Sequence, residues 1–248
     1  PYFENVIVDN RFPLWNLKSY YYLIKQLNSY NFSHVYDLQN SQRTLRYKTL
    51  LLKNALWVTT NRKDHPQSGL QGLIDMLKDN GMLAQEIYEP DITWMVNDVS
   101  SLLKRKNISK KYVVLIPGSS RKHPEKRWPF YKQLAKDFID RGFDVVNILG
   151  PDELGLNKTL LGHKLELLEW GDLAGVINKS LFVIGNDSGP SHIASCLKKP
   201  GLALFGPTTS GAKSELSRPP FRIIETEDLE KFTKVNLIIT IKEFYSFL

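Results

Sequence analysis

Residues 113–120, VVLIPGSS, and residues 181–192, LFVIGNDSGPSH, decide the fold of this chain. Each block is a run of apolar residues that leads into a loop of small residues, and a helix is predicted after each loop. Apolar runs of this kind are typical of parallel strands that are buried on both faces. Loops at the carboxyl ends of such strands expose backbone N–H groups at helix N-termini, where phosphate binds readily. The two blocks therefore predict an α/β fold with a parallel sheet and an anion-binding crevice at one edge of it.

The sequence around these blocks alternates between strand and helix patterns, as a doubly wound sheet requires. In the second part we expect strands at residues 112–116, 145–149, 165–168, 181–184, 202–205 and 221–224. Helices are expected at residues 129–141, 153–161, 172–179, 190–197 and 238–247. Pro129 in a first turn, Gly142 after a helix and Asp172 as an N-cap are the expected boundary residues.

The first part alternates in the same way. It predicts strands at residues 6–8, 34–38 and 56–58 and helices at residues 14–27, 41–52 and 70–78. Residues 87–107 lose this rhythm, contain Pro90 and a Lys/Arg cluster, and are predicted to connect two domains. We therefore expect a partial amino-terminal domain at residues 1–108, a second domain at residues 109–235, and a terminal helix at residues 236–248 that packs back on the first domain.

Composition excludes several classes of protein. The single cysteine, Cys196, rules out a disulfide framework and fits a reducing compartment. No run of about 18 apolar residues is present, and no signal-peptide pattern opens the chain, which begins with Pro1. We therefore expect a cytoplasmic protein.

The chain carries a formal net charge of +7, with basic clusters at residues 104–106, 110–111 and 121–127. These clusters are explained equally well by a solvated surface and by attraction to an anionic partner. A phosphorylated substrate and the inner surface of a membrane are the candidate partners. Nucleic acid ranks last, because no basic motif is interleaved with aromatic residues.

The first candidate site is the loop at residues 117–129. Gly118 lets the backbone approach a ligand, Ser119 and Ser120 supply hydroxyl donors, and Lys126 could place an ammonium group on a diphosphate. An ordinary strand–loop–helix connection explains the loop equally well. It is not a Walker loop, which needs Gly-Lys-Ser/Thr together at the helix start.

The second candidate site follows the strand at residues 181–184. Asp187 lies at the strand end, Ser188 and Gly189 would expose N–H groups at a helix N-terminus, and His192 lies within the first turn. A simple helix cap is the alternative explanation. No metal is expected, because the position four residues after His192 is Cys196 on a face predicted to be buried.

Two further strand ends carry weaker signals. Asp152 or Glu153 could accept hydrogen bonds from ribose hydroxyls, although acidic residues at a helix start are also common for electrostatic reasons. Thr208, in the turn at residues 205–209, could add a donor. All four loops follow predicted strands of one sheet, and this shared position favours a single crevice.

These loops resemble glycosyltransferase family nine, the ADP-heptose:lipopolysaccharide heptosyltransferases. The matching pieces lie at residues 117–120, 126–129, 186–194 and 203–208, and residues 36–39 with Arg43 look like the family's amino-terminal strand and helix. The resemblance covers residues 112–209 strongly and residues 6–82 weakly. It implies a GT-B fold of two Rossmann-like domains with mostly parallel sheets, in which the first domain is incomplete.

The resemblance implies an inverting transfer of heptose from ADP-heptose to a lipopolysaccharide inner-core acceptor, without a cofactor or a metal. Ser119, Ser120 and Lys126 would bind the diphosphate, and Asp152 or Glu153 the ribose. Asp187, Ser188, Gly189 and His192 would contact the phosphates and the donor sugar, and adenine would lie near residues 170–173, including Gly171. Lys126 would also stabilise the charge of the leaving nucleotide, so Lys126 and Asp187 are the predicted catalytic residues.

The chain departs from the family at two points. The family's first strand and Gly-Asp loop, whose aspartate would be the general base, has no counterpart in this sequence, and the spacing between Ser120 and Lys126 is longer. Two alternatives therefore stay open. One is a nucleotide-sugar-binding remnant without catalysis, and the other is a sugar-nucleotide epimerase of the GT-B fold, which needs more acid–base groups than Asp187 and His192 provide.

Overall fold

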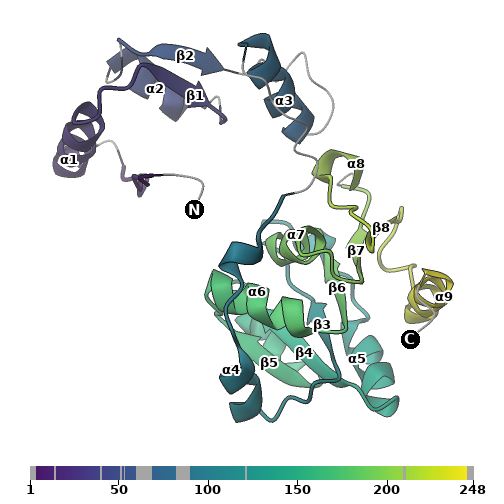
Figure 1. Ribbon diagram of the computed structural model, residues 1–248. Coiled ribbons are helices and arrows are strands. Elements are labelled where there is room, and N and C mark those ends of the chain that lie inside the picture. Colours follow the sequence, from purple (N-terminus) through teal and green to yellow (C-terminus); the bar gives the residue numbers. More distant parts are fainter. Residues whose placement is uncertain are drawn as a thin grey trace. The chain divides into compact units, whose positions relative to one another are not determined.

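The computed structural model describes residues 4–13, 15–39, 41–50, 52, 54–59, 69–81, 90–120, 122–208 and 211–244. Predictions that fall on residues 14, 82, 87, 121, 209 and 247 lie outside these described residues. The chain divides into two compact units, Pro1–Ile87 and Tyr88–Leu248 (Figure 1). Each unit is described by itself.

The first unit has a two-stranded parallel sheet. Its elements are α1 (Leu17–Asn28), β1 (His34–Asp37), α2 (Gln42–Leu50), β2 (Leu56–Thr59) and α3 (Gly69–Asp79). β1 pairs with β2 in parallel, from His34 opposite Leu56 to Asp37 opposite Thr59. Helix α2 connects the two strands, and Ser41 caps it, because its Oγ accepts a hydrogen bond from the Thr44 N–H at 3.2 Å. These strands and helices confirm the alternation predicted between residues 14 and 78.

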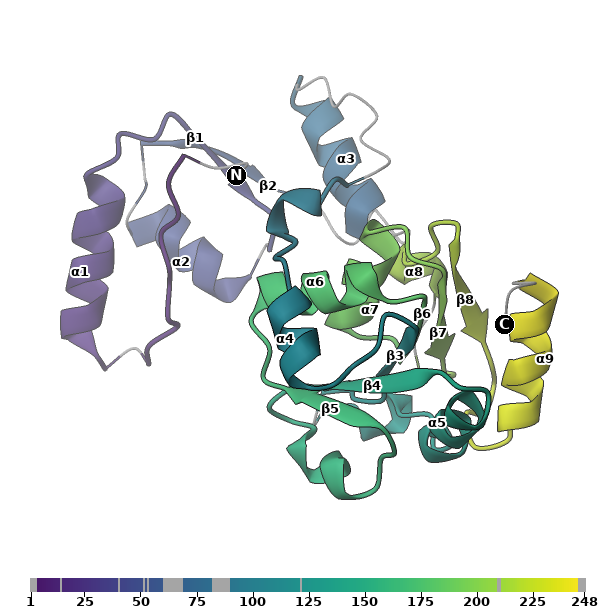
Figure 2. The same ribbon diagram turned by 60° about the horizontal axis from the view of Figure 1, so that its bottom comes forward.

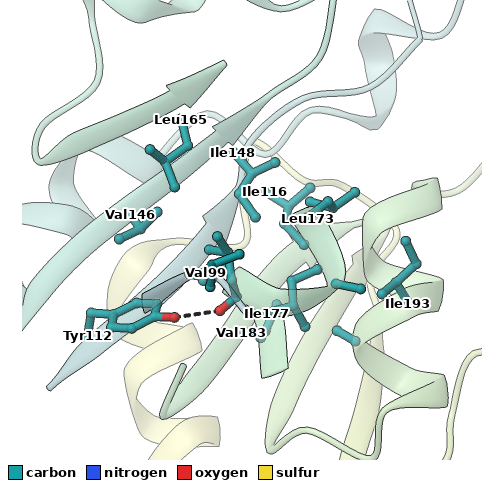
Figure 3. Close-up of a cluster of buried hydrophobic side chains, with 14 of the residues drawn as sticks. Val99, Tyr112, Ile116, Val146, Ile148, Leu165, Leu173, Ile177, Val183 and Ile193 are labelled. Carbon is teal, nitrogen blue, oxygen red and sulfur yellow. Dashed lines mark hydrogen bonds between the residues drawn. The ribbon is translucent and has the colours of Figure 1, made fainter. Parts of the chain in front are cut away.

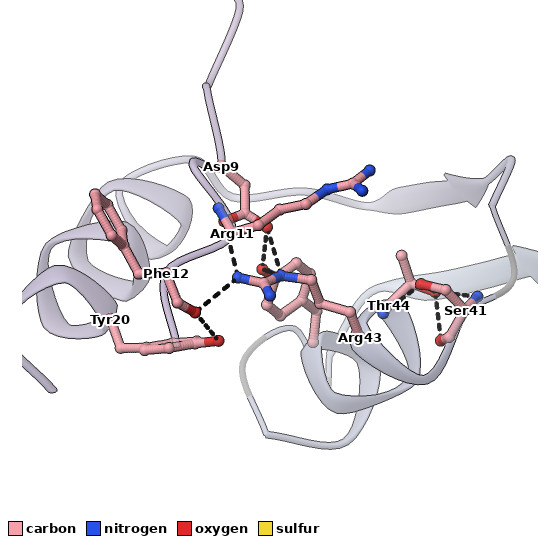
Figure 4. Close-up of polar contacts among 8 residues, drawn as sticks. Asp9, Arg11, Phe12, Tyr20, Ser41, Arg43 and Thr44 are labelled. Carbon is pink, nitrogen blue, oxygen red and sulfur yellow. Dashed lines mark hydrogen bonds and ion pairs between the residues drawn. The ribbon is translucent and has the colours of Figure 1, made fainter. Parts of the chain in front are cut away.

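The strand predicted at residues 6–8 is wrong. The described residues 4–13 form an irregular segment in which Val6 and Val8 are 75% and 69% exposed. A strand needs a neighbouring strand for its backbone groups, and β1 is paired in this unit with β2. The segment is held by side chains instead, since Asp9 accepts hydrogen bonds from Arg43 Nε at 2.7 Å and from the Tyr47 hydroxyl at 2.5 Å (Figure 4).

The second unit contains a six-stranded sheet in the order β5-β4-β3-β6-β7-β8, and all neighbouring strands are parallel. The strands are β3 (Tyr112–Ile116), β4 (Asp144–Leu149), β5 (His163–Glu166), β6 (Phe182–Asn186), β7 (Gly201–Phe205) and β8 (Phe221–Glu225). The helices are η1 (Thr93–Met95), α4 (Ser100–Arg105), η2 (Pro124–Lys126), α5 (Tyr131–Asp140), η3 (Leu154–Lys158), α6 (Trp170–Lys179), α7 (Gly189–Cys196), α8 (Gly211–Ser214) and α9 (Lys234–Phe244). This strand order reverses between β3 and β6, which is the switch point of a doubly wound fold.

Helices cover both faces of this sheet (Figure 2). On β3, Val114 and Ile116 face a cluster with α6 and α7, and Val113 and Leu115 face a second cluster with α5 and α9. Figure 3 shows the first cluster, in which Val146, Leu165 and Ile177 surround the strand. The six predicted strands of this unit are confirmed, although β5 spans residues 163–166 and not 165–168. The four inner strands are almost fully buried, which requires near-continuous apolar runs, whereas the edge strands β5 and β8 are partly exposed.

The residues predicted to form a connection are part of the second unit. Val99, Leu103 and Ile108 are buried in the cluster with α6, and α4 lies within this stretch. The boundary between the units falls at Ile87 and not at residue 108. Apolar contacts of the described residues, rather than the loss of strand and helix rhythm, decide to which unit this segment belongs.

The terminal helix α9 also packs on the second unit. Its Leu237 and Ile241 are buried in the cluster that contains Leu134 and Phe138 of α5. The prediction that this helix packs back on the first domain is therefore replaced by a contact with α5, where the sheet leaves an apolar surface to be covered.

Three local predictions need correction. The helix expected at residues 153–161 is a short 3-10 helix, η3, that contains the poor helix former Gly155. Helix α5 begins at Tyr131, so Pro129 precedes it. Asp172 lies inside α6, and the N-cap of this helix is Glu169. The Asp172 carboxylate accepts a hydrogen bond from Asn97 Nδ2 at 2.9 Å. Gly142 follows α5 with a φ of +80°, as predicted for a helix end.

Candidate functional site

A pocket of about 690 Å³ lies at the carboxyl ends of the central strands of the second unit. Its walls come from residues 118–120 after β3, 148–153 around the end of β4, 167–170 after β5 and 187–190 after β6. These strands flank the switch point between β3 and β6, where doubly wound sheets bind their ligands. The predicted crevice is therefore present, and it is formed within one unit of the chain.

The ammonium of Lys126 and the carboxylate of Asp187 meet in this pocket. Lys126 Nζ lies 2.7 Å from Asp187 Oδ2, and the two side chains are 18% and 16% exposed. Lys126 ends η2, and Asp187 directly follows β6. The longer spacing after Ser120 therefore does not displace Lys126 from the pocket.

The loop after β3 is held by its own hydrogen bonds. Ser119 is 3% exposed, and its hydroxyl donates to the His123 carbonyl at 2.8 Å. Arg127 makes two hydrogen bonds to Ser119. Its Nε donates to the Ser119 hydroxyl oxygen at 3.1 Å, and its Nη2 donates to the Ser119 carbonyl at 2.9 Å. Because a hydroxyl has one hydrogen, the Ser119 side chain has none left for a phosphate oxygen. The exposed Ser120 lines the pocket and is the better placed of the two serines.

Glu153 fills a niche formed by two glycines. Its carboxylate accepts a hydrogen bond from the Gly150 N–H at 2.5 Å, and a Cβ placed on Gly118 would overlap the Glu153 side chain. Gly118 is thus required for contact with Glu153 in this structure. Burial raises the pKa of Glu153 above its ordinary value of 4.5. Asp152 lines the same wall.

Sequence reasoning missed Asn186, which joins two of the loops. This side chain is fully buried, and its Nδ2 donates to the carbonyls of Pro117 at 3.0 Å and Gly118 at 3.1 Å. Its Oδ1 accepts from the Trp128 N–H at 3.3 Å and from the Tyr131 hydroxyl at 3.0 Å. An amide in an otherwise apolar strand, directly before Asp187, is the signal that could have indicated it.

Sequence reasoning placed adenine near residues 170–173 but did not single out Trp170. It begins α6, lines the pocket and is 61% exposed. A large aromatic side chain that is left open beside a polar pocket is suited to stacking on a planar ligand. The adjacent Glu169 lines the same wall.

Three residues predicted for the site lie outside the lining of this pocket. His192 is half-buried on α7, and burial lowers its pKa while the Asp187 carboxylate partly opposes that effect. Gly171 points its carbonyl to the Asn97 N–H at 3.1 Å, and Thr208 is exposed after β7. Thr208 follows β7, which borders β6 on the side away from β3, and the turn after β7 contributes no residue to the pocket lining.

Ser188 and Gly189 lie where they were predicted, at the start of α7 and in the pocket wall. The Ser188 side chain makes no capping hydrogen bond to this helix. Pro190 has no N–H, and the Ser191 N–H donates to the Ser188 carbonyl at 3.1 Å, so the Gly189 N–H is the group at this helix start that can bind a ligand anion. Among the described residues, no group of three or more His, Cys, Asp and Glu side chains is arranged to hold a metal ion.

The sequence model of glycosyltransferase family 9 (heptosyltransferase) matches residues 73–232. The chain belongs to this family. Its member lipopolysaccharide heptosyltransferase 2 of Escherichia coli (strain K12) is 35% identical over 108 residues, which are 38% of this chain and 31% of that protein. Lipooligosaccharide heptosyltransferase 2 of Haemophilus influenzae is 34% identical over 123 residues, 42% of this chain and 34% of that protein. The matches thus span about a third of the curated relatives.

Solved structures show the same fold. The glycosyl transferase family 9 protein from Veillonella parvula superposes with a TM-score of 0.75 at 17% identity, covering 96% of this chain and 81% of that chain. E. coli ADP-heptose lps heptosyltransferase II superposes with a TM-score of 0.70 at 18% identity, covering 90% and 79%. The α/β fold of the GT-B type with mostly parallel sheets is thereby confirmed.

Proposed function

We propose that the pocket of the second unit binds the diphosphate of a nucleotide sugar of the ADP-heptose class. The observation that carries this proposal is Lys126, which a partly buried carboxylate holds at the switch point of a family 9 fold. The whole protein would then transfer heptose, with inversion, to a lipopolysaccharide inner-core acceptor. The names of the curated relatives, which are heptosyltransferases acting on lipopolysaccharide or lipooligosaccharide, support this acceptor.

Each wall of the pocket has a chemical role in the proposal. Lys126 and the Gly189 N–H at the start of α7 bind the diphosphate and stabilise the charge that develops on the leaving nucleotide. Ser120 would add a hydroxyl donor, and Asp152, which also lines the pocket, would accept hydrogen bonds from ribose hydroxyls. Asp187 orients Lys126. Because these groups neutralise the diphosphate, the reaction as proposed uses neither a metal nor a cofactor.

Adenine is proposed to stack on Trp170. The indole is exposed and lines the pocket beside Glu169. Base–aromatic stacking contributes about 1–3 kcal/mol for a nucleotide base. Trp170 therefore replaces Gly171 as the proposed adenine contact.

The protein is proposed to act in the cytoplasm at the inner membrane surface, where a lipid-linked acceptor would be presented. The net charge of +7 supports attraction to anionic lipids. None of the helices in the described ranges combines the length and apolar composition of a membrane span.

The test is a calorimetric titration of ADP into the wild-type chain, Lys126→Ala and the control Lys132→Ala, an exposed residue of α5. We expect the wild type and the control to bind ADP alike and Lys126→Ala to bind at least about tenfold more weakly, because a charge-assisted hydrogen bond is lost. No binding by the wild type, or equal binding by Lys126→Ala, would overturn the proposal. A second assay follows transfer from ADP-heptose to a heptose-deficient core acceptor. ADP binding without transfer would leave the nucleotide site standing and refute the transferase activity of this chain, whereas epimerised donor would indicate an isomerase.

A further inference from the structure

A second cavity, of about 500 Å³, lies at the other end of the sheet of the second unit. It is formed by α4, the loop that follows it, the first residue of β3 and the last residue of α6. The nucleotide pocket lies at the carboxyl ends of the strands, so the two cavities are separated by the length of β3. No residue lines both of them.

The charge of this cavity is positive. Lys104, Lys110 and Lys179 line it, and none of its lining residues is acidic. Lys179 Nζ lies 3.2 Å from Asp98, outside the lining, and donates to Ser100 Oγ at 3.0 Å. Within the part of the chain that the structure describes, Lys104 and Lys110 form no ion pair. Two ammonium groups at this cavity are therefore available for a ligand.

A carboxylate that contacts one of the lining residues is already engaged. Asp144 Oδ2 accepts a hydrogen bond from the Ser109 N–H at 2.6 Å, and this contact lowers the pKa of Asp144. The positive field is extended by Lys106 and Lys111, which are exposed beside the cavity. An anion that enters the cavity meets ammonium groups, and the lining itself contains no opposing carboxylate.

The floor of the cavity is apolar. Leu103 and Ile108 are 8% and 7% exposed, and Tyr112 is 1% exposed. The Tyr112 hydroxyl, which Figure 3 shows with its hydrogen bond, donates to the Val176 carbonyl at 2.6 Å and is therefore engaged within the protein. A bare inorganic ion would leave most of this volume and the apolar floor without a partner.

We propose that this lysine cavity binds an organic phosphate ester, with Lys104 and Lys110 on the phosphate oxygens and the carbon skeleton on the apolar floor. Lysine ammonium groups bind phosphate as point charges, and apolar contact adds affinity for the attached body. A soluble sugar or glycerol phosphate and the headgroup of an acidic phospholipid share this chemistry. The site is distinct from the nucleotide pocket and requires no nucleotide.

The experiment compares the wild type with Lys104→Ala/Lys110→Ala and with the control Lys132→Ala/Lys242→Ala. The control removes the same charge from exposed lysines of α5 and α9. The probes are glycerol 3-phosphate, followed by NMR chemical shifts, and vesicles of phosphatidylcholine with or without phosphatidylglycerol, followed by cosedimentation. All four substituted lysines are exposed, so circular dichroism should show that both variants fold like the wild type.

We expect the wild type and the control to bind at least one probe alike, and the Lys104/Lys110 variant to bind it at least about tenfold more weakly. Binding of glycerol 3-phosphate assigns the cavity to soluble esters, and binding only of vesicles with phosphatidylglycerol assigns it to lipid headgroups. The proposal is overturned if neither probe binds the wild type, or if the control variant loses as much affinity as the cavity variant, since net charge alone would then explain binding. ADP affinity should be the same in all three proteins.

Discussion

Lys126 Nζ lies 2.7 Å from Asp187 Oδ2, although 61 residues separate the two along the chain. They meet because β3 and β6 are parallel neighbours, so the segments that follow both strands emerge at the same edge of the sheet. Both side chains are mostly buried, which reduces the freedom of the ammonium group before a ligand arrives. The pair therefore presents Lys126 to the pocket in a defined position.

The substitution Asp187→Asn separates the contribution of this ion pair to stability from its contribution to ADP binding. We expect the free energy of unfolding to fall by about 1–2 kcal/mol, between the values for exposed and buried pairs. ADP affinity should not fall, because a negative charge has been removed from an anion-binding pocket. Urea unfolding and calorimetry measure the two effects. A loss of ADP affinity as large as that of Lys126→Ala would contradict this division of roles.

Asn186→Ala should affect both stability and ligand binding. The change leaves the carbonyls of Pro117 and Gly118 and the donors of Trp128 and Tyr131 without this partner, and we expect a cost of about 2–5 kcal/mol. ADP affinity should also fall, since the loop after β3 loses its anchor.

Asn147→Ala is the matched control for this prediction. Asn147 is also fully buried, and its Nδ2 donates to the carbonyls of Leu161 and His163, away from the phosphate loop. It should lower stability and leave ADP affinity unchanged at a temperature where both variants are folded. Equal loss of affinity in the two variants would show that Asn186 acts only through general stability.

Gly118→Ala should destabilise the protein by about 1–3 kcal/mol, because its Cβ overlaps the Glu153 side chain. The second change Glu153→Ala removes the obstructing atoms and should recover most of this loss. A double-mutant cycle by urea unfolding measures the coupling. If the two effects simply add, the steric explanation of Gly118 is incorrect.

Glu153 makes stability depend on pH. Its pKa in the folded protein lies above the ordinary value of 4.5, so over that interval the folded state holds a proton that the unfolded chain releases. The contribution of Glu153 to stability therefore falls as pH rises from 4.5 through the raised pKa. Glu153→Gln should remove this part of the slope in urea unfolding measured across that interval, and an identical slope in both proteins would refute the assignment.

Trp170→Ala tests the proposed adenine contact. The side chain is 61% exposed, so stability should change little, while ADP affinity should fall by about 1–3 kcal/mol. Trp170→Phe should retain part of the affinity. Trp94→Ala is the control, since Trp94 is 57% exposed and does not line the pocket. Equal affinities in wild type and Trp170→Ala would remove Trp170 from the nucleotide site.

The second sheet was predictable because its four inner strands are buried on both faces. Residues 112–116 and 202–205 must then be apolar throughout, and such runs are visible without any tertiary information. Residues 6–8 show the limit of this rule. They are also apolar throughout, but a strand forms only where another strand can pair with it, and the partner is not encoded locally.

The site was predictable at the strand ends and less so between them. Ser188 and Gly189 follow the apolar run of β6 closely, so parallel strand direction brings them to the edge where the loop after β3 also emerges. Lys126 lies ten residues beyond β3, and its ion pair with Asp187 is a tertiary contact. His192 and Thr208 were placed in the site because they follow strands of the same sheet, but neither lines the pocket.

The sequence by itself determined the order of strands and helices in the second unit, because burial and backbone hydrogen bonding impose a local pattern on each element. Only the tertiary structure decided that Asn186 ties the loops at Gly118 and Trp128, that the Ser119 hydroxyl is engaged by its own loop, and that residues 92–108 pack on the sheet of the second unit. Each of these depends on contacts outside the local strand or helix pattern. A hydrogen-bond partner or an apolar neighbour is selected by distance in space, which periodicity along the chain does not specify.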